Sequence, residues 1–374
     1  MNRKPVNGPL QGIKILDLSR LLPGPLATQM MADLGAEVIK IEDPNAPDYA
    51  RFFPPYIGGQ STMYLSLNRS KKSITLNLRT EEGKQKFFSL IKTADVVVDS
   101  FRPGVLQKLG IDYDAAKLYN DKIIYVAITG YGYSGPYKDK AGHDINYIGY
   151  SGILGLTGDI EKPVIPACQT ADIAGGSYPA IVACLSALWA RERTGKGQFV
   201  DVSMTDCALP MLSMQFGDLL NADLIPQRGE PMLSGGLANY NIYQCKDGRW
   251  IVMGSLEPKF WKKTCILFGK PEWESRITPN PDTIDELKKD LELIFKTKTR
   301  DEWIKEAEAY DSCLSPVLEL DEVPNDKHLQ ERGMFLEMEH PEYGKIKTVN
   351  QPFKFHGTPA QPSWAAPLMG EDNA

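Results

Sequence analysis

Three side chains in this sequence could hold or move protons: His143, Asp172 and Glu257. His143 is one of only four histidines, and it stands where a Gly/Pro-rich loop, GYGYSGPYKDKAG, runs into the apolar segment DINYIGYSG. A histidine at a helix entrance can cap the helix, pack as a structural residue or transfer protons near neutral pH. The chemistry it does depends on what else the chain brings to that place.

Asp172 begins an apolar helix predicted over 172–193 and is followed closely by Gly175 and Gly176. Such an acid is most simply an N-cap. The free backbone N–H groups around it could also stabilise an oxyanion, and the two glycines would let a flat group approach the backbone. Glu257 starts another predicted helix, where an acid in the first turn is favourable.

Five basic side chains stand near the ends of predicted strands and could together hold several phosphates. Taken singly, each is better explained as a solvated surface charge, and the cluster is more suggestive than its members. Arg102 lies just past the fourth strand, where ligands of open parallel sheets bind. The candidates for binding the phosphates are Lys40, Arg69, Lys71, Lys72 and Arg102.

The elements that must position these side chains alternate between strand and helix. Strands are predicted over 13–19, 37–42, 71–78, 95–100 and 122–129, with helices over 24–36 and 80–94. This alternation predicts an α/β fold with a Rossmann-like, open parallel sheet. The turn after the first strand, SRLLPGPLA, lacks the Gly-x-Gly-x-x-Gly of dinucleotide sites, which disfavours an NAD enzyme.

The chain is long for one core, which predicts two domains. We expect the N-terminal part of a large domain over 1–200, a helix and linker over 201–238, and a smaller α+β domain over 239–330. The smaller domain opens with a hairpin around Asp247-Gly248.

Composition excludes several function classes. The net charge of −6 argues against a nucleic-acid scaffold, and no apolar run approaches the roughly 20 residues of a membrane span. Six scattered cysteines without a CxxC pair predict reduced core thiols and no metal site. The N-terminal residues lack a signal-peptide pattern, so the expected location is the cytoplasm.

Several segments in order resemble the CaiB/BaiF group, the family III CoA-transferases and α-methylacyl-CoA racemases. They include GIKILDLSRLLPGPLATQMMADLGAEVIKIEDP, NRSKKSITLNL, SFRPGVLQKLGID, ADIAGG and RERTGKGQFVDVSM. The resemblance implies acyl-CoA substrates, no cofactor beyond the CoA of the substrate, and an interlocked homodimer. It also implies that residues 331–374 return to the large domain.

Two chemistries share one carboxylate in this group. In transferases the aspartate that matches Asp172 attacks the thioester and becomes an acyl anhydride, then an enzyme–CoA thioester. In racemases it is one of two acid/base groups, and the histidine of GHDINY, here His143, is the other. The segment LEPKFW is similar to the racemase segment whose glutamate, here Glu257, supports that histidine.

Inverting a carbon next to a thioester requires one group on each face, because one removes the α-proton and the other returns a proton to the opposite side. The amides at the start of the 172–193 helix could stabilise the intervening enolate. We therefore expect a racemase of 2-methylacyl-CoA thioesters, an enzyme of lipid metabolism. A CoA-transferase and a non-catalytic acyl-CoA-binding protein are the alternatives.

Overall fold

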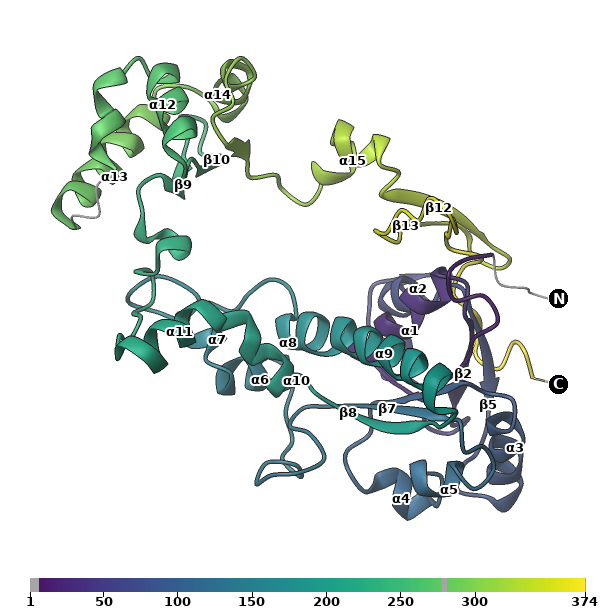
Figure 1. The fold of residues 1–374 in the computed structure, drawn as a ribbon. Helices are drawn as coiled ribbons and strands as arrows, with labels where there is room; N and C mark the ends of the chain where they lie inside the picture. The colour runs from purple at the N-terminus through teal and green to yellow at the C-terminus, as the bar shows by residue number, and fades with distance from the viewer. Residues whose placement is uncertain (1–6, 278–280, 374) are drawn as a thin grey trace. The chain divides into compact units, whose positions relative to one another are not determined.

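A six-stranded parallel sheet forms the centre of the fold (Figure 1). The computed structural model describes residues 7–277 and 281–373. The α/β architecture with a parallel sheet is confirmed. Its strands are β1 (Lys14–Asp17), β2 (Glu37–Glu42), β5 (Lys71–Thr75), β6 (Val96–Asp99), β7 (Ile124–Thr129) and β8 (Gln198–Ser203).

The strand order in this sheet is β5-β2-β1-β6-β7-β8. The chain therefore builds outward from β1 in one direction and then, from β6 onward, in the other. In a sheet of this order the connections after the two central strands leave on opposite faces, which opens a crevice at their carboxyl ends. The topology thus predicts a ligand site beyond Asp17 and Asp99, the last residues of β1 and β6.

Helices cover both faces of the sheet. α1 (Pro23–Asp33) and α9 (Tyr178–Thr194) pack on one face, and α9 lies along β7 and β8. On the other face, α3 (Glu81–Ile91), α4 (Val105–Leu109) and α5 (Tyr113–Ala116) close the main apolar core (Figure 1). Strand side chains that are fully buried, such as those of β6 and β7, are what a sheet covered on both faces requires.

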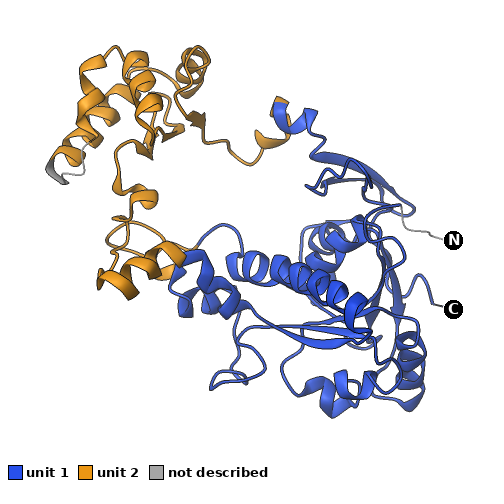
Figure 2. Cartoon of the chain, viewed as in Figure 1, with its two compact units in different colours: residues 1–153, 166–212, 328–374 blue, residues 154–165, 213–327 orange. Residues whose placement is uncertain are grey.

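The chain divides into two compact units (Figure 2). Unit 1 comprises residues 1–153, 166–212 and 328–374, and unit 2 comprises residues 154–165 and 213–327.

The C-terminal segment of unit 1 contains the hairpin of β12 (Phe335–His340) and β13 (Gly344–Val349), preceded by α15 (Lys327–Glu331). It lies against the edge strand β5: the Trp364 carbonyl accepts a hydrogen bond from Ser70 N–H at 2.8 Å. Asp372 accepts another from the Ser73 N–H at 2.9 Å.

Unit 2 has a core of its own. Its antiparallel sheet has the order β11-β10-β9, and the hairpin of β9 (Tyr240–Gln244) and β10 (Trp250–Gly254) turns at Asp247-Gly248, as predicted. Buried aromatic side chains, including Trp261, Phe295 and Trp303, fill the core. The other elements are α12 (Pro258–Leu267), α13 (Pro281–Phe295), α14 (Arg300–Ala307) and β11 (Leu314–Pro316).

Short elements fill the connections. The hairpin of β3 (Tyr56–Ile57) and β4 (Gln60–Ser61) and the helix α2 (Thr62–Leu67) lie between β2 and β5. Between β7 and α9 come α6 (Asp144–Tyr150), α7 (Ile153–Leu156) and α8 (Thr170–Asp172). After β8 the expected single helix is broken at Pro210 into α10 (Met204–Ala208) and α11 (Ser213–Ala222), because proline cannot continue an α-helix.

The helical stretch Thr170–Thr194 is by length and composition apolar enough to span a membrane, because an 18-residue window within it has a mean hydropathy of 1.5. The sequence prediction did not anticipate such a segment. Its C-terminal part, α9, packs on the sheet, as a core helix does. The outer side of α9 nevertheless exposes apolar side chains, namely Tyr178, Val182, Leu185 and Trp189.

The six cysteines are free thiols, but they do not all belong to the core. Cys184, Cys245 and Cys265 are buried as predicted, whereas Cys168 and Cys313 are exposed. Both exposed cysteines lie in connections outside the regular elements, where the apolar packing that buries a thiol is missing.

Candidate active site

A cavity of about 410 Å³ opens at the carboxyl edge of the parallel sheet. Its walls come from the connections after β1 and β6, from the end of β7, and from the starts of α6 and α10 together with the short helix α8. This is the position that the strand order predicts for a ligand. Both His143 and Asp172 line this cavity.

His143 is the residue immediately before α6, and its backbone is extended with φ of −129°. Its N–H donates to Oδ1 of Asn146 at 3.0 Å, and its carbonyl accepts from the Asn146 N–H at 2.8 Å. These bonds fix the main chain at the helix entrance. The imidazole is on an exposed residue and lines the cavity, so the capping role and a chemical role are compatible.

Asp172 is the last residue of α8 and is half-buried. Burial, and secondly the negative charge of Asp144, raise the pKa of Asp172 to about 7. A carboxyl group with such a pKa is present in both protonation states at neutral pH, so it can act as a base in one direction and as an acid in the other. That behaviour is what proton transfer to and from carbon requires.

Asp144 has a contact that the sequence did not predict. An aspartate at the start of a helix usually caps that helix, but the Oδ1 of Asp144 accepts hydrogen bonds from the N–H groups of Ala171 (2.6 Å) and Asp172 (3.0 Å), outside α6. The prediction that these amides are free to stabilise an enolate oxygen is therefore wrong. The next amide, that of Ile173, is also engaged, with the Gln169 carbonyl.

The glycines after Asp172 serve helix packing. A Cβ on Gly175 would lie 2.6 Å from the backbone oxygen of Met204, and one on Gly176 would lie 3.0 Å from Cβ of Pro23. Both residues are buried. The space beside them, which we expected to receive a flat ligand group, is filled by α10 and by the start of α1.

Cationic side chains surround the rest of the cavity. Arg102 lies there as predicted from its position after β6, and Arg20, Lys138 and Lys140 join it. The guanidinium of Arg20 lies over the Phe101 ring at 5.0 Å. The sequence prediction missed these three residues, although two of them stand in the segment YKDK that directly precedes AGHD.

The other four basic candidates do not line this cavity. Each one has a carboxylate partner inside unit 1, at N–O distances of 2.5 to 3.0 Å. The side chains of Lys40 and Lys71 are fully buried, which a charged group tolerates only with close partners. CoA binding by these four stays a prediction, to which their geometry gives no support. The pairs are Lys40–Asp48, Arg69–Asp33, Lys71–Asp17 and Lys72–Glu37.

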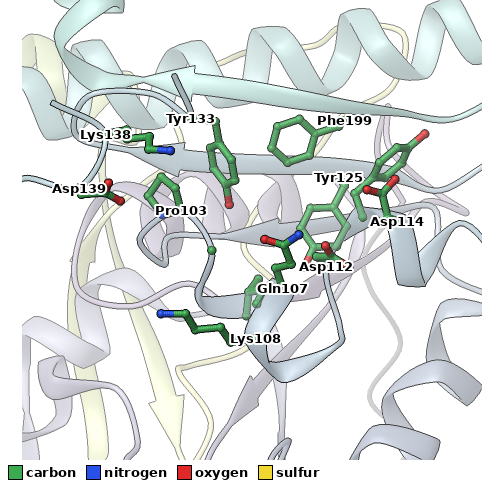
Figure 3. A pocket seen from close by; sticks show the side chains of 13 residues that line it. Pro103, Gln107, Lys108, Asp112, Asp114, Tyr125, Tyr133, Lys138, Asp139 and Phe199 are labelled. Carbon is green, nitrogen blue, oxygen red and sulfur yellow. The ribbon is translucent and has the colours of Figure 1, made fainter. Parts of the chain in front are cut away.

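A second cavity, of about 600 Å³, lies beside α4 and α5 and shares Pro103 and Lys138 with the first (Figure 3). One side chain of α4, Lys108, adds a further cation to its wall. The remaining wall combines aromatic rings with three carboxylates. The rings are Tyr113, Tyr125, Tyr133 and Phe199, and the carboxylates are Asp112, Asp114 and Asp139. No sequence signal pointed to this cavity, because its aromatic residues come from distant elements and suit a core equally well.

Glu257 belongs to unit 2, whereas His143 and Asp172 belong to unit 1. It is the exposed N-cap residue of α12, where its carbonyl accepts hydrogen bonds from the N–H groups of Phe260 and Trp261. Its predicted support of the imidazole stays a prediction. Within residues 7–277 and 281–373, no three His, Cys, Asp or Glu side chains are grouped as metal ligands would be.

Known proteins resemble this chain in both sequence and fold. Residues 10–373 match the model of CoA-transferase family III. The chain is 33% identical to the α-methylacyl-CoA racemase of Homo sapiens, over 97% of this chain and 91% of the racemase. It is 32% identical to the succinyl-CoA:glutarate CoA-transferase of the same organism, over 97% of this chain and 84% of that enzyme. A crystal structure of a CaiB/BaiF family protein from Brucella suis superposes with a TM-score of 0.86 at 31% identity, covering 98% of this chain and 97% of that one.

Proposed function

We propose that this chain, which belongs to CoA-transferase family III, is a racemase that interconverts the 2R and 2S forms of 2-methylacyl-CoA thioesters. The observation that carries the proposal is that His143 and Asp172 line one cavity whose other charged groups are cations. An imidazole and a carboxyl group of raised pKa are a suitable pair for removing a proton from carbon and returning one.

In the proposed reaction, the thioester lies in the cavity with its α-carbon between the two side chains. The ionised carboxylate of Asp172 takes the α-proton of one epimer, and the electron pair of the broken C–H bond passes into the thioester to form an enolate. The imidazolium of His143 then donates a proton to the opposite face of the α-carbon. The reverse reaction uses neutral His143 as the base and protonated Asp172 as the acid.

The cations beside the cavity suit the phosphates of CoA. Arg102, Lys138 and Lys140 are all exposed, so their charged ends are available to a ligand. The aromatic walls of the neighbouring cavity suit the flat base of a nucleotide (Figure 3). We propose that the nucleotide end of CoA binds across these two cavities while the acyl end faces His143 and Asp172.

We also propose that the enzyme is a homodimer. The exposed apolar side chains of α9 lie at helical spacing on one side of the helix, from Tyr178 to Trp189. A second copy of the chain could cover this stripe, as apolar stripes of this kind require a partner. In such a dimer Glu257 could orient the imidazole of His143 from either chain.

The second candidate is a CoA-transferase with Asp172 as the nucleophile. The transferase relatives support it, because their identity to this chain is close to that of the racemase. The Asp172 carboxylate would attack the thioester carbonyl to give an acyl-aspartyl anhydride and release CoA. The CoA thiolate then attacks the aspartyl carbonyl of the anhydride, which releases the donor carboxylate and leaves an enzyme–CoA thioester. An acceptor carboxylate takes up the CoA by the reverse of these two steps. His143 is not needed as an acid or base in that sequence.

The test incubates one pure epimer of a 2-methylacyl-CoA with the enzyme in heavy water. The proposal predicts loss of optical purity and one deuterium at the α-carbon, with no second carboxylic acid present. A transferase would instead move CoA to an added acid without deuterium at the α-carbon, and hydroxylamine would inactivate it during turnover by trapping acyl-aspartate. Absence of both activities would refute both candidates.

A further inference from the structure

We propose that Asp144 is a positioning residue. Its carboxylate holds the start of α6, next to His143, against α8, which carries Asp172. Its negative charge also acts on Asp172. The inference rests on the proposed function, because Asp144 would act through His143 and Asp172, the two proposed acid/base groups. It assigns no contact between Asp144 and the substrate.

One oxygen of Asp144 accepts two backbone hydrogen bonds across the gap between the helices. The bonds come from the N–H groups of Ala171 and Asp172, at 2.6 and 3.0 Å, and they link positions 27 and 28 residues apart. Hydrogen bonds from backbone N–H groups to a carboxylate are about twice as strong as neutral ones. The residue directly before Asp144 is His143, so the bridge joins the two places where the proposed acid/base groups leave the backbone.

The helix at the Asp172 end depends on this contact. α8 has only three residues, and its own N-cap residue, Gln169, makes no side-chain bond to the helix. The first amides of a helix have no partner within it, and a carboxylate that accepts from them fixes the position of that turn. Asp144 therefore supplies from α6 the cap that α8 lacks.

The charge of Asp144 has a second effect, on the ionisation of Asp172. After burial, it is the other cause that raises the pKa of Asp172. Among the described residues, the other titratable groups that face the cavity are cations, tyrosines and the imidazole, with no further carboxyl group. They are Arg20, Arg102, Lys138, Lys140, Tyr49, Tyr131, Tyr147 and His143.

Two substitutions separate the effects. Asp144→Asn keeps an oxygen that can accept both N–H groups but removes the charge, whereas Asp144→Ala removes both. Asp301→Asn is the matched control, because Asp301 is also a first-turn aspartate, on α14 of unit 2. The rate of deuterium exchange is measured against pH for the epimer that Asp172 deprotonates.

For that epimer the rate rises with pH as Asp172 ionises. Removing a negative neighbour lowers the pKa of Asp172, so in Asp144→Asn the rise should move to lower pH, with the plateau preserved. In Asp144→Ala we expect the plateau kcat to fall by about tenfold to a hundredfold with little change in KM, because the acid/base groups are displaced. A wild-type pH profile in Asp144→Asn, or a wild-type kcat in Asp144→Ala, overturns the inference.

A readout without activity distinguishes this inference from the proposed function. Hydrogen exchange at the amides of Ala171 and Asp172 should be faster in Asp144→Ala and close to wild type in Asp144→Asn and Asp301→Asn. An NMR titration of the Asp172 carboxyl carbon should show the lower pKa in Asp144→Asn. If the wild-type enzyme catalyses no exchange at the α-carbon, the proposed function fails alone, and these two measurements still decide for or against the role of Asp144.

Discussion

Replacing Asp172 with asparagine should stabilise the protein at neutral and alkaline pH. Burial, followed by the charge of Asp144, raises the pKa of Asp172 from 3.8 to about 7 in the folded state. The folded state therefore binds this proton more tightly than the unfolded chain does. The stability that the protonated group contributes is fully present below pH 3.8 and is lost as pH rises through about 7.

The magnitude follows from the two pKa values. Their difference, 7 minus 3.8, is about 3. Ionisation of Asp172 therefore lowers the free energy of unfolding by about 4 kcal/mol if no other effect intervenes. The side chain is only half-buried, so water screens part of this penalty, and we expect about 2 kcal/mol. Asparagine has nearly the same shape and carries no charge, so Asp172→Asn should recover that amount above the folded-state pKa.

Urea unfolding of the wild type and of Asp172→Asn at about pH 5 and about pH 8 measures this difference. The advantage of the variant in free energy of unfolding should be larger at the higher pH, while proton exchange into the epimer that Asp172 deprotonates is lost. Asp285→Asn, on the exposed side of α13, is the control and should show no such pH-dependent difference. An advantage of Asp172→Asn that is absent, or equal at both pH values, would refute the reasoning that burial penalises the charged carboxylate.

Three further outcomes are expected. Lys71→Met should lower the free energy of unfolding by about 3–5 kcal/mol in urea titrations, because it leaves a fully buried carboxylate without its cation. Arg102→Ala should raise KM for the acyl-CoA by about tenfold with kcat nearly unchanged, whereas Lys86→Ala, in an exposed ion pair of α3, should change neither. Gly175→Ala should destabilise the protein by about 1–3 kcal/mol in thermal or urea unfolding, since its Cβ would meet a backbone oxygen of α10 at 2.6 Å.

The sheet could be predicted from the sequence because its signals are local. Short segments rich in Ile and Val, such as EVIKIE and KIIYVAIT, are typical of strands, and they became β2 and β7. The hairpin at Asp247-Gly248 follows from its turn residues. The break at Pro210 was not predicted, although its signal is local too, since proline disfavours a helix interior.

The site was predicted less completely, because its contacts join residues distant in sequence. A basic residue near a strand end looks the same whether it faces solvent or a buried carboxylate, and Lys40 and Lys71 prove to do the latter. An aspartate at a helix start is predicted to cap that helix. The sequence around Asp144 does not indicate that its side chain accepts hydrogen bonds from the amides of a different helix, α8. His143 and Asp172 were candidates from residue type and position, and the resemblance to a family paired them. Their common cavity emerges only from the fold.

The central claim is that two groups act on opposite faces of one carbon, and proton exchange with each pure epimer in His143→Ala and Asp172→Asn tests it most directly. With one base missing, the other can still remove and return the proton on its own face. Each variant should therefore incorporate deuterium into one epimer only, a different epimer for each variant, and neither should invert the α-carbon. If both variants lose exchange into the same epimer, or if either one still inverts the centre, the two-sided mechanism is contradicted.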